Sequence, residues 1–260
     1  MRKKGLKLMH TQYYKEYSHN LGRDMEFKVY GHAGQPIVVF PCQDGNFYDF
    51  EDRGMINLVA NHIEEGRLQL ICVSSIDKET WSASYGEHHG RIMWHNQYEK
   101  YVNEEFLPRL HEIHAETDST SYQGKVMLTG ASMGGYHCVN FYLRRPDLYG
   151  GCLSLSGLFH ASYFFENYSD MEVYYNSPND FMRNMSPDHY LVDQYRQGNI
   201  IICCGQGAWE DEAKEDARAL KADFERLGVS AWVDLWGEDV NHDWPWWLIQ
   251  FPYFMEKILG

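Results

Sequence analysis

Long apolar runs are missing from this chain of 260 residues. No segment has the roughly 18 consecutive apolar residues that a membrane-spanning helix needs. The first residues, Met1-Arg2-Lys3-Lys4, have the basic character of a secretory signal. The apolar stretch of about 7 to 15 residues that completes such a signal does not follow them. We therefore expect no membrane partner and a cytoplasmic location.

Positive charge is also scarce, because 23 Lys and Arg face 37 Asp and Glu, for a formal net charge of -14. This excess of negative charge repels phosphate backbones, so we expect no nucleic-acid partner. The six cysteines lack the paired spacing of a zinc site, and His111-Glu112-Ile113-His114 and Glu87-His88-His89 lack the H-E-x-x-H spacing of zinc proteases. Gly205-Gln206-Gly207 lacks the third glycine of a dinucleotide-binding loop. We expect neither a metal nor a cofactor.

Apolar runs of strand length alternate with amphipathic stretches of helix length, which is the pattern of an α/β fold. We predict a mostly parallel central sheet of about eight strands with an antiparallel N-terminal edge and helices on both faces, in a single domain over residues 1–260. The predicted strands are 13–18, 25–30, 36–40, 68–74, 125–130, 152–156, 200–204 and 231–236. The predicted helices are 55–65, 97–114, 133–144, 212–227 and 244–259, with a long loop at 75–96 and an aromatic-rich insertion of short helices, interpreted as a cap, at about 159–195.

The strongest local motif is Gly130-Ala131-Ser132-Met133-Gly134, a G-x-S-x-G between a predicted strand and a predicted helix. This context is typical of a nucleophile elbow, where the serine lies on a turn too tight for neighbouring side chains. The helix N-terminus that follows favours developing negative charge. Ser132 is therefore the candidate nucleophile.

A serine nucleophile of this kind is followed in the chain by an acid and then by a histidine, each in a loop after a later strand. Of the histidines after the elbow helix, His242 alone directly follows a predicted strand, so it is the candidate base. The loop after the strand 200–204 carries the candidate acid, for which we choose Glu210, with Asp211 as the alternative and Asp239 or Glu212 left open. The acid holds the imidazole in one tautomer and stabilises its protonated form.

Three segments together resemble a known family: Gly-Ala-Ser-Met-Gly-Gly at 130–135, Gly-Gln-Gly-x-x-Glu at 205–210 and Asn-His-Asp-Trp at 241–244. They are similar to the "putative esterase" group of the α/β-hydrolase superfamily, which includes esterase D (S-formylglutathione hydrolase), feruloyl and acetyl xylan esterases, enterochelin esterase and mycolyltransferases. The resemblance implies that Ser132, Glu210 and His242 are nucleophile, acid and base. It also implies that the backbone N–H groups of Met133 and Gln43 form the oxyanion hole.

These residues lead us to expect a serine carboxylesterase that acts on a small or carbohydrate-linked ester through an acyl-enzyme. The alternatives are an acyltransferase with the same triad and a catalytically inactive binding protein of the same fold. The sequence does not determine whether the chain forms a homo-oligomer. Candidate substrate contacts follow the fourth strand or flank the acid and the base: Trp81, Tyr85, His88, Trp209 and Trp244.

Overall fold

The computed structural model describes residues 9–118, 122–166 and 168–260. The amino-terminal segment on which the expected cytoplasmic location rests lies outside these ranges, so that location stays a prediction. Within the described ranges, no helix combines the length and the apolar character needed to cross a bilayer.

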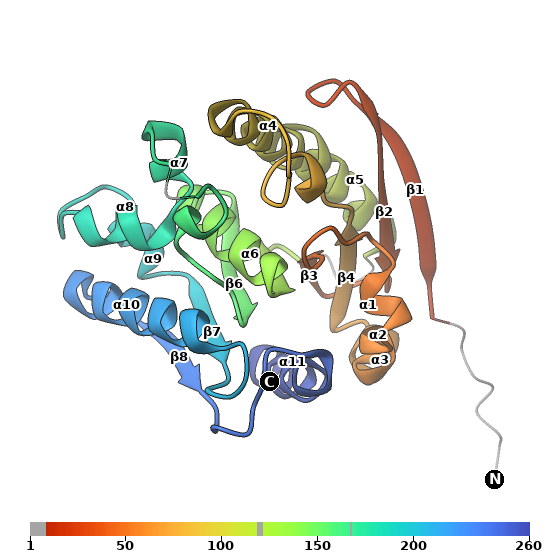
Figure 1. The fold of residues 1–260 in the computed structure, drawn as a ribbon. Helices are drawn as coiled ribbons and strands as arrows, with labels where there is room; N and C mark the ends of the chain where they lie inside the picture. The colour runs from red at the N-terminus through yellow and green to blue at the C-terminus, as the bar shows by residue number, and fades with distance from the viewer. Residues whose placement is uncertain (1–8, 119–121, 167) are drawn as a thin grey trace, which may run out of the picture.

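A central sheet of eight strands organises the described part of the chain (Figure 1). Its spatial order is β1-β2-β4-β3-β5-β6-β7-β8. The first two strands form an antiparallel hairpin, and β2 pairs antiparallel with β4. All pairs from β4 to β8 are parallel. The strands are β1 (Thr11–Ser18), β2 (Arg23–Tyr30), β3 (Gln35–Phe40), β4 (Leu68–Val73), β5 (Val126–Ala131), β6 (Tyr149–Leu155), β7 (Asn199–Cys204) and β8 (Ala231–Leu235). The prediction of a mostly parallel sheet with an antiparallel N-terminal edge is confirmed.

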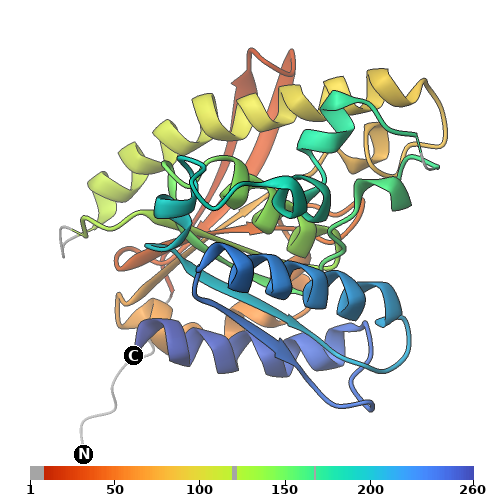
Figure 2. The same ribbon diagram turned by 90° about the vertical axis from the view of Figure 1, so that its left-hand side faces the viewer.

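Helices cover both faces of this sheet, as the two views in Figures 1 and 2 show. One face carries α4 (His88–Lys100), η2 (Tyr101–Phe106), α5 (Leu107–Thr117), α6 (Met133–Arg144) and α10 (Asp211–Leu227). The other face carries α1 (Asp49–Asp52), α2 (Met55–Leu58), α3 (Ala60–Glu64) and α11 (Trp244–Leu259). The remaining short helices are η1 (Asp77–Glu79), η3 (Ala161–Tyr163), α7 (Met171–Tyr175), α8 (Pro178–Asn184) and α9 (Val192–Tyr195).

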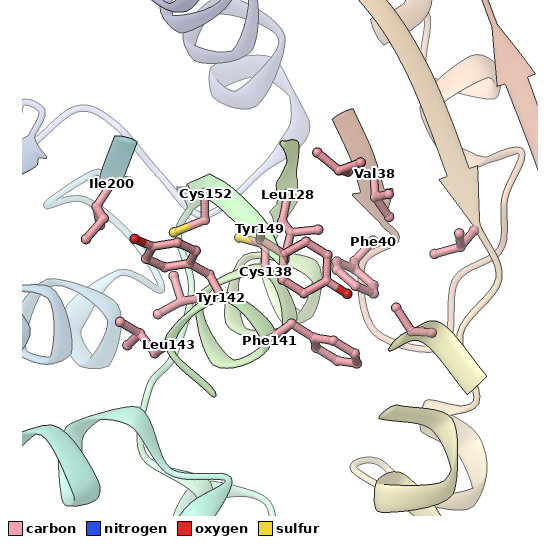
Figure 3. Close-up of a cluster of buried hydrophobic side chains, with 14 of the residues drawn as sticks. Val38, Phe40, Leu128, Cys138, Phe141, Tyr142, Leu143, Tyr149, Cys152 and Ile200 are labelled. Carbon is pink, nitrogen blue, oxygen red and sulfur yellow. The ribbon is translucent and has the colours of Figure 1, made fainter. Parts of the chain in front are cut away.

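The strands from β3 to β7 are largely apolar because both of their faces are buried, as is usual for a parallel sheet. Figure 3 shows one of the two resulting cores, in which side chains of the sheet meet the buried face of α6. Val38, Leu128, Cys152 and Ile200 come from four strands. Phe141 of α6 packs against Phe40 of β3, with 4.9 Å between the ring centres. This packing fixes the helix that follows Ser132 against the middle of the sheet.

Three of the predicted elements differ from the structure. The predicted loop 75–96 contains η1 and the first nine residues of α4. The predicted helix 97–114 is therefore the second half of a longer helical segment, which changes to π-helix at η2 and continues as α5. The predicted helix 55–65 is broken at Val59, whose backbone leaves the helical region at φ -118° and ψ 15°. Val59 is β-branched, which lowers its helix propensity.

The insertion between β6 and β7 consists of short helices, as predicted from its broken periodicity. It contributes to a pocket of about 490 Å³ whose lining includes Tyr174, Tyr175, Tyr190 and Tyr195. None of the candidate catalytic residues lines this pocket. That the insertion acts as a cap, and that the whole chain is one domain, stay predictions.

Candidate active site

The candidate catalytic residues lie at one edge of the sheet because each follows a parallel strand. Gln43 follows β3, Ser132 follows β5, Glu210 follows β7 and His242 follows β8. Parallel strands present their carboxyl ends at the same edge, where open α/β sheets bind their ligands. Ser132 and His242, which are 110 positions apart in the chain, therefore meet here.

Ser132 occupies a strained turn between β5 and α6. Its backbone has φ 56° and ψ -120°, which a non-glycine residue adopts only when its surroundings hold it there. Its N–H donates to the Leu155 carbonyl at 2.8 Å. A Cβ on Gly134 would lie 2.3 Å from the Phe40 oxygen, and one on Gly130 would lie 2.4 Å from the Gly134 carbonyl carbon. The glycines of the motif are thus required by the close approach of β3, β5 and α6.

The imidazole of His242 lies between Ser132 and Glu210. Its Nε2 is 2.9 Å from the Ser132 Oγ, and its Nδ1 is 3.5 Å from Glu210 Oε2. The Glu210 side chain is fully buried, whereas that of Asp211 is 80% exposed and pairs with Lys214. Glu212 and Asp239 are exposed as well. Of the four carboxylates that the sequence offered as the acid, Glu210 lies next to His242 in the structure.

Glu210 is held by contacts that the sequence did not reveal. Its Oε1 accepts a hydrogen bond from the Ser156 hydroxyl at 2.5 Å and one from the Gly205 N–H at 3.3 Å. Ser156 in turn accepts from the Trp247 indole N–H at 3.0 Å. This series of hydrogen bonds engages Oε1 and leaves Oε2 facing His242. Ser156 directly follows β6 and Trp247 lies in α11, so no local motif joins either residue to the acid loop.

The loops that carry the acid and the base are hydrogen-bonded to each other. The His242 N–H donates to the Ala208 carbonyl at 3.0 Å, and the Gly207 N–H donates to the Val240 carbonyl at 2.9 Å. The side chain of Asn241 accepts from the Ala208 N–H at 2.8 Å. Asn241 was quoted in the motif but received no role from the sequence. These bonds fix the spacing between Glu210 and His242.

Two backbone segments, which follow β3 and β5, carry the N–H groups expected to form the oxyanion hole. Met133 is the first residue of α6, and the first N–H groups of a helix have no partner within it. Gln43 is exposed in the loop after β3, directly before Asp44, whose φ is 61°. The resemblance assigned the oxyanion hole to these two N–H groups.

A pocket of about 510 Å³ opens beside Gln43. The Arg53 guanidinium lies 5.2 Å from the centre of the Trp244 ring at this pocket. The sequence analysis named Trp244 as a substrate contact, whereas Asp49 and Asp52 were not among its candidates. The pocket is lined by Cys42, Gln43, Asp49, Asp52, Arg53 and Trp244.

The other candidate substrate contacts lie in different surroundings. Trp81 is only 2% exposed, and its indole N–H donates to His95 Nδ1 at 2.9 Å, so we no longer consider it a substrate contact. Tyr85 is 67% exposed, but it lines a separate pocket with Glu79 and Trp94. His88 begins α4 and contacts the Tyr168 ring. Trp209 is 86% exposed and directly precedes Glu210, so it lies at the rim of the site.

The candidate active site consists of the Ser132 hydroxyl, the His242 imidazole and the Glu210 carboxylate. Within the three described ranges, no group of three or more His, Cys, Asp or Glu side chains is arranged to hold a metal ion. A serine hydroxyl, an imidazole and a buried carboxylate in series are the arrangement that supports acyl transfer.

Comparisons with known proteins identify the family and the fold. A family model described as "putative esterase" matches residues 18–254. A search of curated proteins finds no match. A ferulic acid esterase from Anaeromyces mucronatus superposes with a TM-score of 0.71 at 12% identity, covering 100% of this chain and 94% of that one.

Two further solved structures share the fold. A fluorophosphonate-binding serine hydrolase F from Staphylococcus aureus has a TM-score of 0.70 and 15% identity, with 97% of this chain and 99% of that chain covered. An S-formylglutathione hydrolase from Agrobacterium tumefaciens has a TM-score of 0.69 and 15% identity, with 96% and 94% covered. The predicted α/β-hydrolase fold and the predicted esterase class are confirmed. The chain belongs to the "putative esterase" family, has the α/β-hydrolase fold and is a carboxylic ester hydrolase.

Proposed function

We propose that this chain hydrolyses a small-molecule carboxylic ester by a two-step mechanism in which Ser132 is the nucleophile. The observation that carries the proposal is the 2.9 Å contact between the Ser132 Oγ and His242 Nε2, at a strained strand-to-helix turn. Serine hydroxyls are weak nucleophiles unless a base accepts their proton. His242 is in position to be that base.

In the first step, the Ser132 Oγ attacks the ester carbonyl carbon while His242 Nε2 takes the hydroxyl proton. The imidazolium that forms is stabilised by the Glu210 carboxylate on the Nδ1 side. The tetrahedral intermediate then collapses, the bond to the alcohol oxygen breaks, and His242 returns the proton to that oxygen. The alcohol leaves and the acyl group remains on Ser132.

The negative oxygen of the intermediate requires donors that are oriented before the reaction. The N–H groups of Met133 and Gln43 are our candidates. Backbone donors of this kind cost no reorganisation when charge develops, and each contributes about 10²- to 10³-fold to kcat in serine hydrolases. The N-terminus of α6 adds a favourable dipole at the same point.

In the second step, water replaces the alcohol. His242 Nε2 accepts a proton from a water molecule as the water oxygen attacks the acyl carbonyl carbon. The tetrahedral intermediate then collapses, the bond between the acyl carbon and the Ser132 Oγ breaks, and His242 returns the proton to Oγ, which releases the carboxylic acid. Each proton that leaves the nucleophile is thus returned, and the enzyme ends unchanged.

We propose further that the substrate is a small or carbohydrate-linked ester. The pocket beside Gln43 supports this class because it offers carboxylates and a guanidinium beside an indole ring. Carboxylate acceptors and guanidinium donors suit hydroxyl-rich groups, and an aromatic face suits an apolar ring surface. The exposed Trp209 provides a second aromatic surface at the rim.

Kinetics with p-nitrophenyl acetate test the role of Ser132. Ser132→Ala is expected to lower kcat by about 10⁴- to 10⁶-fold. Ser186→Ala is a matched control, because the Ser186 hydroxyl is also hydrogen-bonded to a side chain, that of Asp188, but lies on the exposed insertion. It is expected to retain the parent rate. A Ser132→Ala variant with undiminished activity would overturn the proposal.

A further inference from the structure

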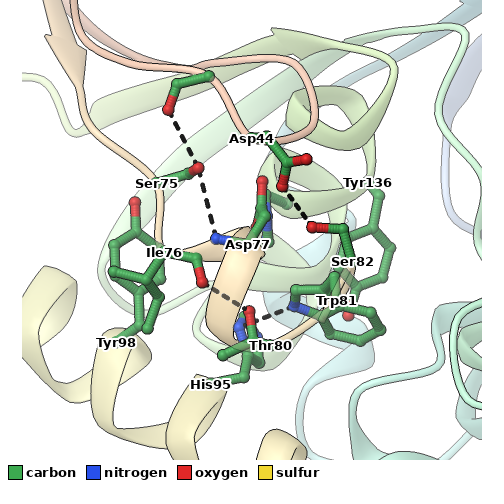
Figure 4. A network of polar contacts seen from close by, with 12 residues as sticks. Asp44, Ser75, Ile76, Asp77, Thr80, Trp81, Ser82, His95, Tyr98 and Tyr136 are labelled. Carbon is green, nitrogen blue, oxygen red and sulfur yellow. Dashed lines mark hydrogen bonds and ion pairs between the residues drawn. The ribbon is translucent and has the colours of Figure 1, made fainter. Parts of the chain in front are cut away.

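The loop after β3 that carries Gln43 is held by two serines from another part of the chain (Figure 4). Ser82 donates its hydroxyl hydrogen to the Asp44 carboxylate. Ser75 donates to the Gly45 carbonyl, from its hydroxyl at 3.1 Å and from its N–H at 3.4 Å. Both contacts fall on the two residues that directly follow Gln43. The conformation of this loop therefore depends on where the two serines lie.

Both serines are fixed by the turn that follows β4. The Asp77 carbonyl accepts from the Ser82 N–H at 3.0 Å, and the Asp77 N–H points to the Ser75 hydroxyl at 3.5 Å. The Thr80 N–H also donates to the Asp77 carbonyl, at 2.9 Å. Asp77 thus organises a compact turn whose two ends present Ser75 and Ser82 to the loop of Gln43.

The side chain of Asp77 connects this turn to the helix behind Ser132. Its Oδ1 lies 2.9 Å from His137 Nε2, and both side chains are buried, with exposed fractions of 2% and 1%. His137 belongs to α6 and lies five residues after Ser132. Breaking a buried pair of this kind is costly, so the turn and α6 move together.

A continuous set of contacts therefore links the two segments proposed to form the oxyanion hole. Met133 begins α6, His137 of α6 bonds Asp77, the Asp77 turn holds Ser82, and Ser82 holds Asp44 next to Gln43. The non-glycine φ of 61° at Asp44 is an unfavourable conformation that persists only where the surroundings hold it. The Ser82 hydroxyl constrains Asp44 directly, through its hydrogen bond to the carboxylate.

We propose that the Asp77–His137 pair, together with Ser75 and Ser82, sets the spacing between the Met133 and Gln43 N–H groups. Ser82 is then a positioning residue, which acts on the reaction through Gln43. The donors for a developing oxyanion need to lie within about 0.5 Å of their productive positions. A loop that lacks the hydrogen bonds from Ser75 and Ser82 samples a wider range of positions. The inference rests on the proposed function, because it assigns a support to the same oxyanion hole.

A double-mutant cycle with p-nitrophenyl acetate tests this inference. Gln43→Pro removes the N–H donor, and Ser82→Ala removes the hold on Asp44. We expect Ser82→Ala to lower kcat about tenfold with KM unchanged, and Gln43→Pro to lower kcat about 10²-fold. In the Gln43→Pro background, Ser82→Ala is expected to change kcat less than twofold, because the donor it positions is absent. Fully additive losses would overturn the inference.

Two further variants keep the inference falsifiable if Gln43→Pro does not fold. Ser82→Thr retains the hydroxyl and is expected to retain the parent kcat. Asp44→Ala removes the acceptor of the same bond and is expected to reproduce the loss of Ser82→Ala. A Ser82→Ala variant with the parent kcat, or one in which KM alone changes, would overturn the inference.

The outcome for Ser132 distinguishes this inference from the proposed function. An active Ser132→Ala enzyme would mean that the proposed function itself fails. An inactive Ser132→Ala enzyme beside a fully active Ser82→Ala enzyme would reject the positioning role alone.

Discussion

Replacing Glu210 with glutamine tests how much the buried carboxylate contributes to catalysis. The substitution keeps the shape of the side chain and removes its charge. The new amide retains an oxygen that can accept from Ser156 and Gly205, so we expect the variant to fold. It loses the negative charge that faces His242 Nδ1 at 3.5 Å.

The size of the effect follows from this distance. Two unit charges 3.5 Å apart interact by about 5 kcal/mol at an effective dielectric constant of about 20. The imidazolium exists in the transition state and not in the resting enzyme, so this energy acts mainly on kcat. Since each 1.36 kcal/mol is about tenfold in rate, Glu210→Gln is expected to lower kcat by about 10³-fold.

The assay is ester hydrolysis by the parent, Glu210→Gln and Asp211→Asn, with thermal unfolding as a check on folding. Asp211→Asn is the matched control because Asp211 is the neighbouring carboxylate and is mostly exposed. We expect it to stay within about twofold of the parent, as usual for a surface substitution. A folded Glu210→Gln variant that retains more than a tenth of the parent kcat would refute the reasoning. An equal loss in Asp211→Asn would also refute it.

Three further predictions concern the surroundings of the site. Ser156→Ala removes a donor to the buried Glu210 carboxylate and leaves the Trp247 N–H without its acceptor. Urea denaturation should therefore show a free energy of unfolding lower by about 2 kcal/mol. An unchanged denaturation midpoint would contradict the proposed support of Glu210 by Ser156. Burial raises the pKa of the Cys42 thiol to about 12, so at pH 8 only about one thiol in 10⁴ is ionised, and iodoacetamide should leave both Cys42 and the activity unmodified. Alkylation of Cys42 with rapid inactivation would argue against this. A hydrogen bond to Asp216 raises the pKa of His160 above its ordinary value near 6.5. The stabilisation of the folded state by protonated His160 is therefore complete below about pH 6.5 and is lost as the pH rises through the raised pKa. The difference in unfolding free energy between the parent and His160→Asn should therefore be larger at pH 5.5 than at pH 9, and the opposite order would exclude this origin.

The strands and the order of the candidate site residues were predictable because both follow from local pattern. Buried parallel strands are continuous apolar runs, and the glycines around Ser132 mark a turn that tolerates no side chain. Once the strands are known, their parallel order places the loops of Glu210 and His242 at one edge. The sequence left Asp211 open as an alternative to Glu210, because adjacent residues share the same local pattern; their burial in the folded chain is what separates them.

What the sequence could not predict depends on contacts between distant elements. The first half of α4 was assigned to a loop because the segment from His88 to Asn96 is mostly polar and includes Gly90. Ser156, Trp247 and Asn241 act through side-chain bonds to other loops, which leave no periodic pattern. Trp81 was expected at a ligand-facing loop, yet tertiary packing against His95 and Tyr136 buries it.

The most direct test of the central claim is the intact mass of the protein after incubation with a fluorophosphonate, which phosphonylates a serine that its own active site has activated. The parent and Ser132→Ala are treated side by side, and each is checked for folding by circular dichroism. The account predicts a single adduct on the parent and none on Ser132→Ala. A folded parent without an adduct, or an adduct that persists on Ser132→Ala, would contradict it.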